Sequence, residues 1–261
     1  MPKKLKMLNY LEKFHELRIF NLDEAAAVVG NKHSALALLN RYAGAGLVKR
    51  VRRNLYAAVN LGTKAMEVNR FQIASHITPT ACVAYHSAFE YYGFAHQVFY
   101  TTYVASGSLF NGFECDGMTY QYCTAKLDIG VDVPPMDALV RVTDLSRTVV
   151  DCIDRIDRCG GLEELCQCLN AIPYLDGEMI IRYLEAYDKR ALYKKAGFVL
   201  SHFLDNLKDG EALLDVCRDR GAQGIDRIQS DSQDNVYHKE WGLYAPDNIL
   251  SFLEQGSYAG I

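Results

Sequence analysis

Residues 21–59 decide the fold of the N-terminal part, and they read NLDEAAAVVGNKHSALALLNRYAGAGLVKRVRRNLYAAV. Asn21 can cap a short helix, with Glu24 reaching back to complete a capping box, and Gly30 suits the left-handed position that ends a helix. A further helix is expected over 31–43. Two short helices joined by a glycine-containing turn are typical of a helix-turn-helix.

The flanking segments extend this pattern. Apolar residues recur with helical spacing over 4–17, which predicts an amphipathic helix in front. Behind, the β-rich runs 47–51 and 55–59 are separated by Arg52-Arg53-Asn54, which predicts a hairpin whose Asn54 takes a positive φ. Three helices followed by a hairpin make a winged helix-turn-helix, expected over residues 1–60.

Charge is distributed unevenly along the chain. Residues 1–60 hold 11 of the 28 Lys and Arg residues but only four of the 32 acidic residues, a net charge of +7, which leaves −11 on residues 61–261. Such an asymmetry is expected when one domain meets a polyanion and the other does not. On charge alone, a basic solvated face without a partner is equally compatible.

The second helix of a helix-turn-helix enters the major groove with its N-terminal residues near the bases. Base contacts are therefore expected from the helix 31–43, and phosphate contacts from the hairpin. The expected DNA-binding residues are Lys32, His33, Ser34, Asn40 and Arg41 in the groove, with Lys49, Arg50, Arg52 and Arg53 on the backbone. Leu36, Leu39 and Tyr42 are expected to face the core. The alternative for such a module is protein interaction.

Residues 61–261 predict a mixture of elements, so the fold class is α+β: the winged helix-turn-helix of 1–60 followed by a larger mixed α/β domain over 61–261 with a helical C-terminal part. Strands are expected within 97–142, at 98–105, in a hairpin over 112–124 around Asp116-Gly117, and at 138–142. Helices are expected at 70–74, from Thr78-Pro79-Thr80 to Tyr92, and at 144–156, 161–171, 176–188 and 188–206, with caps at Thr143 and Asp176 and a C-terminal tail after them.

Composition excludes some protein classes. No apolar run exceeds five residues, as at Ala25–Val29, whereas a membrane-spanning helix needs about 20. The basic N-terminus is interrupted by Asn9 and Glu12, so no secretion signal is expected and a cytoplasmic location is predicted. The eight cysteines include no CxxC pair and are expected to be reduced and buried, with a zinc site as the alternative.

Motifs for catalysis are missing from the sequence. No Lys follows an Asp or Glu at the two-residue spacing of restriction-type nucleases, and neither a GxSxG elbow nor a P-loop occurs. Gly107-Ser108 followed by Glu114 and Asp116 loosely resembles a nucleotidyltransferase turn, but Asp116-Gly117 is better explained as a hairpin turn. His76, His86 and His96 are expected to cap or pack rather than to bind a metal. We therefore expect no enzyme, no metal and no cofactor.

Three further stretches carry a family resemblance. They are 73–76 with 85–88 and 91–94, then Val142-Thr143-Asp144-Leu145-Ser146-Arg147-Thr148-Val149-Val150-Asp151-Cys152-Ile153, and, more weakly, 237–243. With the winged helix they resemble the AbiEi family, the antitoxins of type IV toxin–antitoxin systems that act in abortive infection and phage defence. Part of the second stretch also resembles a neighbouring family in which a similar winged helix and middle region precede a nuclease-like domain.

The AbiEi resemblance implies a non-enzymatic autorepressor whose N-terminal domain binds double-stranded DNA at its own promoter, with inverted repeats expected. It implies that 61–261 is an antitoxin domain that counteracts a nucleotidyltransferase-like toxin, with Ser87, Arg147 and Asp151 in the matching motifs. From the residues alone, a structural role is favoured, in which Arg147 pairs with Asp151 at i+4. The alternative function is a plain transcriptional regulator whose second domain senses a ligand or a protein.

Overall fold

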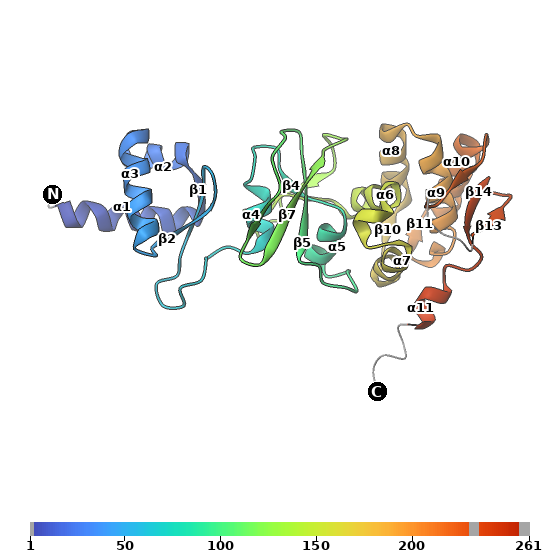
Figure 1. Cartoon of the computed structure of the whole chain (residues 1–261). Helices are drawn as coiled ribbons and strands as arrows, with labels where there is room; N and C mark the ends of the chain where they lie inside the picture. Colours follow the sequence, from blue (N-terminus) through green and yellow to red (C-terminus); the bar gives the residue numbers. More distant parts are fainter. Residues whose placement is uncertain (1–2, 230–234, 256–261) are drawn as a thin grey trace. The chain divides into compact units, whose positions relative to one another are not determined.

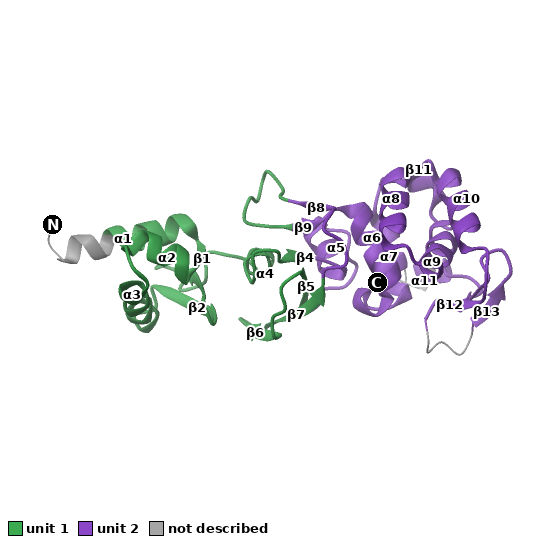
Figure 2. Ribbon diagram, turned by 90° about the horizontal axis from the view of Figure 1, so that it is seen from above, with its two compact units in different colours: residues 1–83, 100–124, 133–141 green, residues 84–99, 125–132, 142–261 purple. Residues whose placement is uncertain are grey.

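The computed structural model describes residues 3–229 and 235–255, which form an α+β fold of two compact units (Figures 1 and 2). Unit 1 comprises Met1–Val83, Tyr100–Thr124 and Val133–Arg141, and unit 2 comprises Ala84–Phe99, Ala125–Asp132 and Val142–Ile261. The chain therefore enters each unit more than once. In the described ranges, no helix combines the length and the apolar character needed to cross a bilayer.

Unit 1 begins with three helices and a small antiparallel sheet of strand order β1-β3-β2. These elements are α1 (Lys3–Leu17), β1 (Ile19–Asn21), α2 (Leu22–Val29), α3 (Lys32–Gly44), β2 (Val48–Arg52) and β3 (Leu55–Ala58). In Figure 1 they are the blue helices and strands nearest the N-terminus. The predicted helices and hairpin are confirmed, and a third strand, β1, joins the hairpin.

Local signals in the sequence account for these boundaries. Asn21 accepts hydrogen bonds from the backbone of Asp23 and Glu24, and the Glu24 carboxylate accepts one from Asn21 N–H, so the predicted capping box is confirmed. Gly30 ends α2 at φ 109°, and Asn54 has φ 67° in the hairpin loop. These two residues adopt the left-handed region that most side chains resist, and the chain turns at both.

The core of this part is aromatic, with Phe14 stacked on Phe20 at a centroid distance of 4.6 Å. Leu39 and Tyr42 of α3 are buried in it, as predicted. The prediction for Leu36 was wrong, because its side chain is 41% exposed. Leu36 lies on the outer face of α3, three residues after exposed His33 and four before exposed Asn40.

The remainder of unit 1 is a sheet in which β4 pairs with β5, β5 with β7, and β7 with β6. Its elements are α4 (Arg70–Ser75), β4 (Cys82–Val83), β5 (Thr101–Ser106), β6 (Phe113–Cys115) and β7 (Met118–Thr124). The strands β5 and β7 are parallel, whereas β6 and β7 form the predicted hairpin. Asp116 and Gly117 both have positive φ, as a tight two-residue turn requires.

Two predictions in this region were wrong. No helix starts at Thr78-Pro79-Thr80, because the hydroxyls of Thr78 and Thr80 hydrogen-bond Ser106 Oγ instead of capping a helix. The chain forms β4 first, and α5 is confined to His86–Tyr92. The strand expected at 138–142 begins only at Val142, in β9 (Val142–Thr143), because Pro134 and Asp137 accept backbone hydrogen bonds that fold 134–140 into successive turns.

Unit 2 is mostly helical, and α6 packs against α5, α8 and α9. Its elements are α5, β8 (Val131–Asp132), β9 (Val142–Thr143), α6 (Leu145–Asp154), η1 (Ile156–Cys159), α7 (Leu162–Ala171), β10 (Leu175–Asp176), α8 (Gly177–Tyr187), α9 (Arg190–Leu200), η2 (Leu204–Asn206), β11 (Leu207–Lys208), α10 (Gly210–Gly221), β12 (Asp226–Arg227), β13 (Asn235–His238), β14 (Leu243–Pro246) and α11 (Ser251–Gln255). The helical character predicted for 144–206 is confirmed.

The predicted cap Asp176 is confirmed, since its side chain accepts the backbone N–H groups of Glu178 and Met179 at the start of α8, but the predicted cap Thr143 is wrong. The N-cap of α6 is Asp144, whose Oδ1 accepts the Arg147 N–H at 2.8 Å, while Thr143 bonds the Thr148 hydroxyl instead. Helix α9 ends at Leu200 instead of at the predicted 206. In its last turn the Ser201 hydroxyl donates a hydrogen bond to the Phe198 carbonyl oxygen. Gly197 of α9 lies directly against the ring of Trp241, where a Cβ would clash.

Candidate functional site

The first turn of α3 presents the expected polar residues to the surface. Lys32, His33 and Ser34 are all exposed. Asn31 fixes the start of the helix by accepting the Ser34 N–H at 2.8 Å, and Lys32 Nζ lies 2.5 Å from Asp23 Oδ1. The helix therefore begins with a fixed backbone and solvated side chains, which is the arrangement that contact with a ligand at its N-terminus needs.

Farther along α3, Asn40 and Arg41 are also exposed. Positions seven and eight residues apart return to the same side of a helix, so His33 shares one face with both of them. Leu36 lies between His33 and Asn40 along this face of the helix. The outer face of α3 thus combines hydrogen-bonding groups, a cation and one apolar side chain.

The hairpin places two arginines beside that face. Arg50 and Arg53 are exposed. Both line a cavity of about 500 Å³ that Leu36 and Tyr56 also line. Because Leu36 belongs to α3 and the arginines to the hairpin, the structure brings these two parts of the predicted interface together.

Lys49 and Arg52 lie elsewhere. Lys49 forms an ion pair with Asp116 at the β6–β7 turn. The Arg52 guanidinium lies over the rings of Phe110 and Phe113, at 5.4 and 5.0 Å from their centroids, and burial lowers the pKa of Arg52 below its ordinary value. These two residues contact the larger sheet of unit 1, a long-range packing that the hairpin sequence does not signal.

The Asp116 contact also bears on the loose nucleotidyltransferase resemblance. Asp116 occupies the turn with φ 51° and pairs with Lys49, while Glu114 is exposed on β6. Ser108 donates its backbone N–H to Ser106 Oγ at 3.0 Å. These contacts account for Asp116 and Ser108 as parts of turns.

The residues of the second motif form a buried polar centre on α6. Arg147 Nε donates to both carboxylate oxygens of Asp151, at 3.3 and 3.2 Å, which confirms the predicted i,i+4 pair. Arg147 Nη1 also donates to the carbonyls of Leu127 and Ile129, and the Tyr187 hydroxyl donates to Asp151. Burial raises the pKa of the Asp151 carboxyl, although Arg147 and Tyr187 both favour its charged form.

Arg147 and Asp151 are each 1% exposed and Ser87 is fully buried. Their side chains therefore have almost no surface to offer a partner, and Arg147 ties α6 to the segment 127–129. One turn after Asp151, Asp154 pairs with Lys126 and Lys189 at 2.6 and 2.7 Å. Burial alone would raise the pKa of Asp154, but the two ammonium groups lower it overall.

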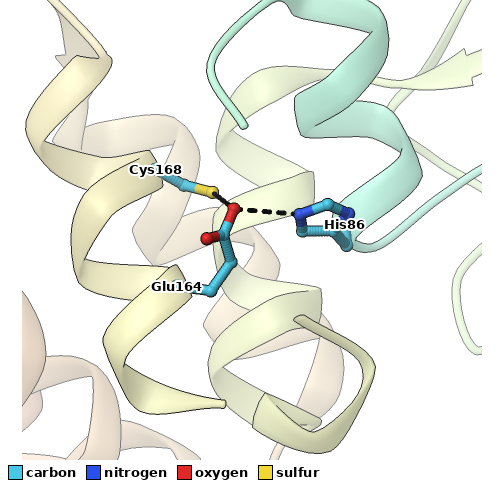
Figure 3. A group of neighbouring side chains, drawn as sticks. All are labelled: His86, Glu164 and Cys168. Carbon is cyan, nitrogen blue, oxygen red and sulfur yellow. Dashed lines mark hydrogen bonds and ion pairs between the residues drawn. The ribbon is translucent and has the colours of Figure 1, made fainter. Parts of the chain in front are cut away.

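A second buried cluster, formed by His86, Glu164 and Cys168, was not predicted (Figure 3). Glu164 lies between the other two: its Oε1 is 3.0 Å from His86 Nε2 and 3.6 Å from Cys168 Sγ. Burial tends to lower the pKa of His86, but the carboxyl groups of Glu164 and Glu90 raise it overall. The sequence signal that could have indicated the cluster is the i,i+4 spacing of Glu164 and Cys168 within an expected helix.

Comparison with protein-family models and with curated proteins finds no match for this chain. Its function is therefore inferred from its residues and their geometry.

Proposed function

We propose that this chain is a DNA-binding autorepressor and the antitoxin of a type IV toxin–antitoxin system that acts in abortive infection. In this proposal, α1 to β3 form a winged helix-turn-helix with the β2–β3 hairpin as the wing. The observation that carries it is the exposed face of α3 beside Arg50 and Arg53, within a segment of net charge +7.

The outer face of α3 has the chemistry needed to read a major groove. Lys32, His33 and Ser34 lie at its N-terminal end, where base edges are nearest in a docked helix. Asn40 offers the donor and acceptor pair that matches adenine, and Leu36 offers an apolar contact for a thymine methyl group. Because a single recognition helix reads a short half-site, two copies on an inverted repeat of the protein's own promoter are proposed.

Arg50 and Arg53 supply phosphate contacts from the wing. Lys49 and Arg52 are assigned a different role, since their partners Asp116, Phe110 and Phe113 lie outside α1 to β3. The Lys32–Asp23 pair, by contrast, lies within α2 and α3 and leaves the two side chains 67% and 64% exposed. Residues that bind phosphates without reading bases act on affinity for every DNA sequence and on its salt dependence.

The remainder of the chain, with a net charge of −11, is proposed to counteract a nucleotidyltransferase-like toxin without being an enzyme itself. The resemblance of 142–153 to AbiEi proteins supports this assignment. Because Arg147 and Asp151 are buried, we assign them to holding α6 in place, and the proposed toxin-directed action belongs to exposed residues.

The second candidate is a plain regulator whose unit 2 senses a ligand. It is favoured by a cavity of about 400 Å³ in that unit, lined among others by Asp132, Asp144, Asp176 and Tyr174. Burial raises the pKa of Asp132, and the nearby Asp144 carboxylate adds to this effect. A cationic ligand would fit such a lining.

DNA binding is tested by the affinity of the full chain for the DNA upstream of its own gene, measured by fluorescence anisotropy at several salt concentrations. Removing both wing arginines, in Arg50→Ala/Arg53→Ala, should weaken binding to all sequences and reduce the salt slope by up to ~2 units. The matched control is Arg220→Ala/Lys239→Ala, two exposed basic residues of unit 2. Equal slopes for the two double variants would exclude the wing assignment.

Antitoxin activity is tested by growth during co-expression with the adjacent gene. The full chain should rescue growth, and so should a His33→Ala/Asn40→Ala variant that no longer binds the promoter. Point variants are preferable to a truncation at residue 61, because Tyr100–Thr124 belongs to the same compact unit as the N-terminal helices. Absence of toxicity together with promoter binding would favour the plain regulator.

A further inference from the structure

The cluster of His86, Glu164 and Cys168 contains three different metal-ligating groups whose donor atoms lie within 4.8 Å of one another. All three side chains are at most 1% exposed. Tetrahedral zinc, with bonds of about 2.0–2.3 Å, places its ligand atoms roughly 3.3–3.6 Å apart. The observed separations of 3.0 Å between His86 and Glu164 and 3.6 Å between Glu164 and Cys168 are close to that spacing.

The backbone holds these donors on one side. Glu164 and Cys168 are four residues apart on α7, so they project from the same face of the helix. His86 is the first residue of α5, and its ring stacks on Phe99 at a centroid distance of 3.9 Å. Phe99 in turn lies so close to Gly160 that a Cβ there would meet its ring. Tight packing therefore fixes the imidazole orientation.

The surroundings are those of a metal-binding histidine. A carboxylate or carbonyl normally accepts the second ring N–H of such a histidine and sets its tautomer. Here Glu90 Oε2 lies 3.6 Å from His86 Nδ1, an ion-pair distance longer than a hydrogen bond, on the side of the ring opposite to the cluster. Glu164 is itself oriented by the backbone N–H groups of His96 and Gln97, which both donate to Oε1 at 2.9 Å.

Glu164 also retains an unused acceptor. Within the described part of the chain, its buried Oε2 accepts no hydrogen bond, and it lies 3.8 Å from the ring nitrogen of His96. A buried carboxylate oxygen without a hydrogen-bond donor costs free energy, which a bound cation would offset.

The thiol of Cys168 distinguishes this cluster from a simple buried ion pair. Cys168 is fully buried, and its Sγ lies 3.6 Å from Glu164 Oε1. An ordinary pair of protonated imidazole and carboxylate would account for His86 and Glu164. It would not account for the buried thiol of Cys168 beside the same carboxylate.

We propose that His86 Nε2, the Glu164 carboxylate and Cys168 Sγ bind a thiophilic divalent cation of the Zn²⁺ type. Three protein ligands from α5 and α7, all buried, make this a site that stabilises the fold of unit 2. The proposal departs from the sequence-based expectation that His86 only packs. It is independent of the proposed function.

The full chain, purified without an affinity tag and dialysed against metal-free buffer, provides the first test. Elemental analysis should find about one zinc per chain, the stoichiometry of a single site. Replacement of zinc by Co²⁺ should produce a thiolate-to-metal charge-transfer band. A wild-type protein that retains no metal and shows no such band with added Co²⁺ would refute the site, leaving a buried imidazole–carboxylate pair.

Variants then locate the metal. Cys168→Ser and His86→Gln should lose both zinc and the cobalt band, while the matched control Cys217→Ser, a buried cysteine of α10 outside the cluster, should keep both. Glu90→Gln leaves all three ligands in place and should weaken metal affinity about 10–100-fold. This variant remains informative if the ligand variants fail to fold. Unchanged zinc content in Cys168→Ser, or unchanged affinity in Glu90→Gln, would overturn the assignment.

Discussion

Replacing Arg147 by Met tests the buried centre of unit 2 most directly. The change removes two hydrogen bonds to Asp151 and those to the carbonyls of Leu127 and Ile129. Asp151 would then remain 1% exposed with the Tyr187 hydroxyl as its donor. Breaking a buried ion pair by deleting one partner costs about 3–5 kcal/mol. Because whole domains are stable by only about 5–15 kcal/mol, the free energy of unfolding should fall by a large fraction.

Urea unfolding followed by tryptophan fluorescence measures this change in the right unit. Trp241 is the single tryptophan of the chain and is 7% exposed in unit 2. The matched control is Arg155→Met, because Arg155 pairs with Asp157 at 2.6 Å while both side chains are well exposed. An exposed pair contributes about 0.2–1 kcal/mol, so the control should unfold almost as the wild type does.

A double variant sharpens the test. In Arg147→Met/Asp151→Leu no unpaired charge is left behind, and the stability should recover in part, since apolar replacement of a whole buried pair is often neutral. A loss below about 1 kcal/mol in Arg147→Met, or one equal to that of Arg155→Met, would refute the reasoning that burial makes this pair essential. No recovery in the double variant would show that the geometry of the arginine matters more than its charge.

Three further changes have defined outcomes. Asp154→Asn should lower the free energy of unfolding by roughly 1–3 kcal/mol at pH 7. Folding lowers the pKa of Asp154. The stability difference between the wild type and Asp154→Asn should therefore persist at pH values above the unfolded-state pKa of about 4, and disappear as the pH falls through the folded-state pKa. Urea titrations at several pH values would reveal this dependence. Gly197→Ala should lower the free energy of unfolding by about 1–3 kcal/mol, because the added methyl group would clash with Trp241. Gly44→Ala should not destabilise the protein, because there is open space around Gly44 among the described residues. Thermal unfolding compares the two variants. Asn31→Ala should cost about 1 kcal/mol by removing the cap of α3, and a change below the error of the same thermal measurement would contradict the capping role.

The parts of the fold that sequence predicts are those set by neighbouring residues. The capping box of Asn21 and Glu24, the Asp116-Gly117 turn and the positive φ of Asn54 each depend on backbone within a few positions. The i,i+4 pairing of Arg147 and Asp151 is of the same kind. For that reason the helices and hairpin of residues 3–59 were predicted almost to the residue.

The errors arise where a distant segment competes for a local group. Thr78 is a good capping residue, but Ser106 binds its hydroxyl, so the predicted helix does not start there. The hairpin sequence predicts that Arg52 binds phosphate, but in the structure its guanidinium lies over the rings of Phe110 and Phe113. Likewise, His86 and Glu164 are 78 positions apart, and only the packing of α5 against the rest of unit 2 makes them neighbours.

All eight cysteines are buried and form no disulfide, three in unit 1 and five in unit 2, and all but Cys168 lie outside the proposed metal site. A thiol reacts only when reagent reaches it, so alkylation of the folded protein is limited by how often each region opens. The alkylation rate of each cysteine therefore reports how often its region of the fold opens. Mass spectrometry of the modified peptides over time would rank the local opening rates of the two units in the unaltered chain, without any introduced probe.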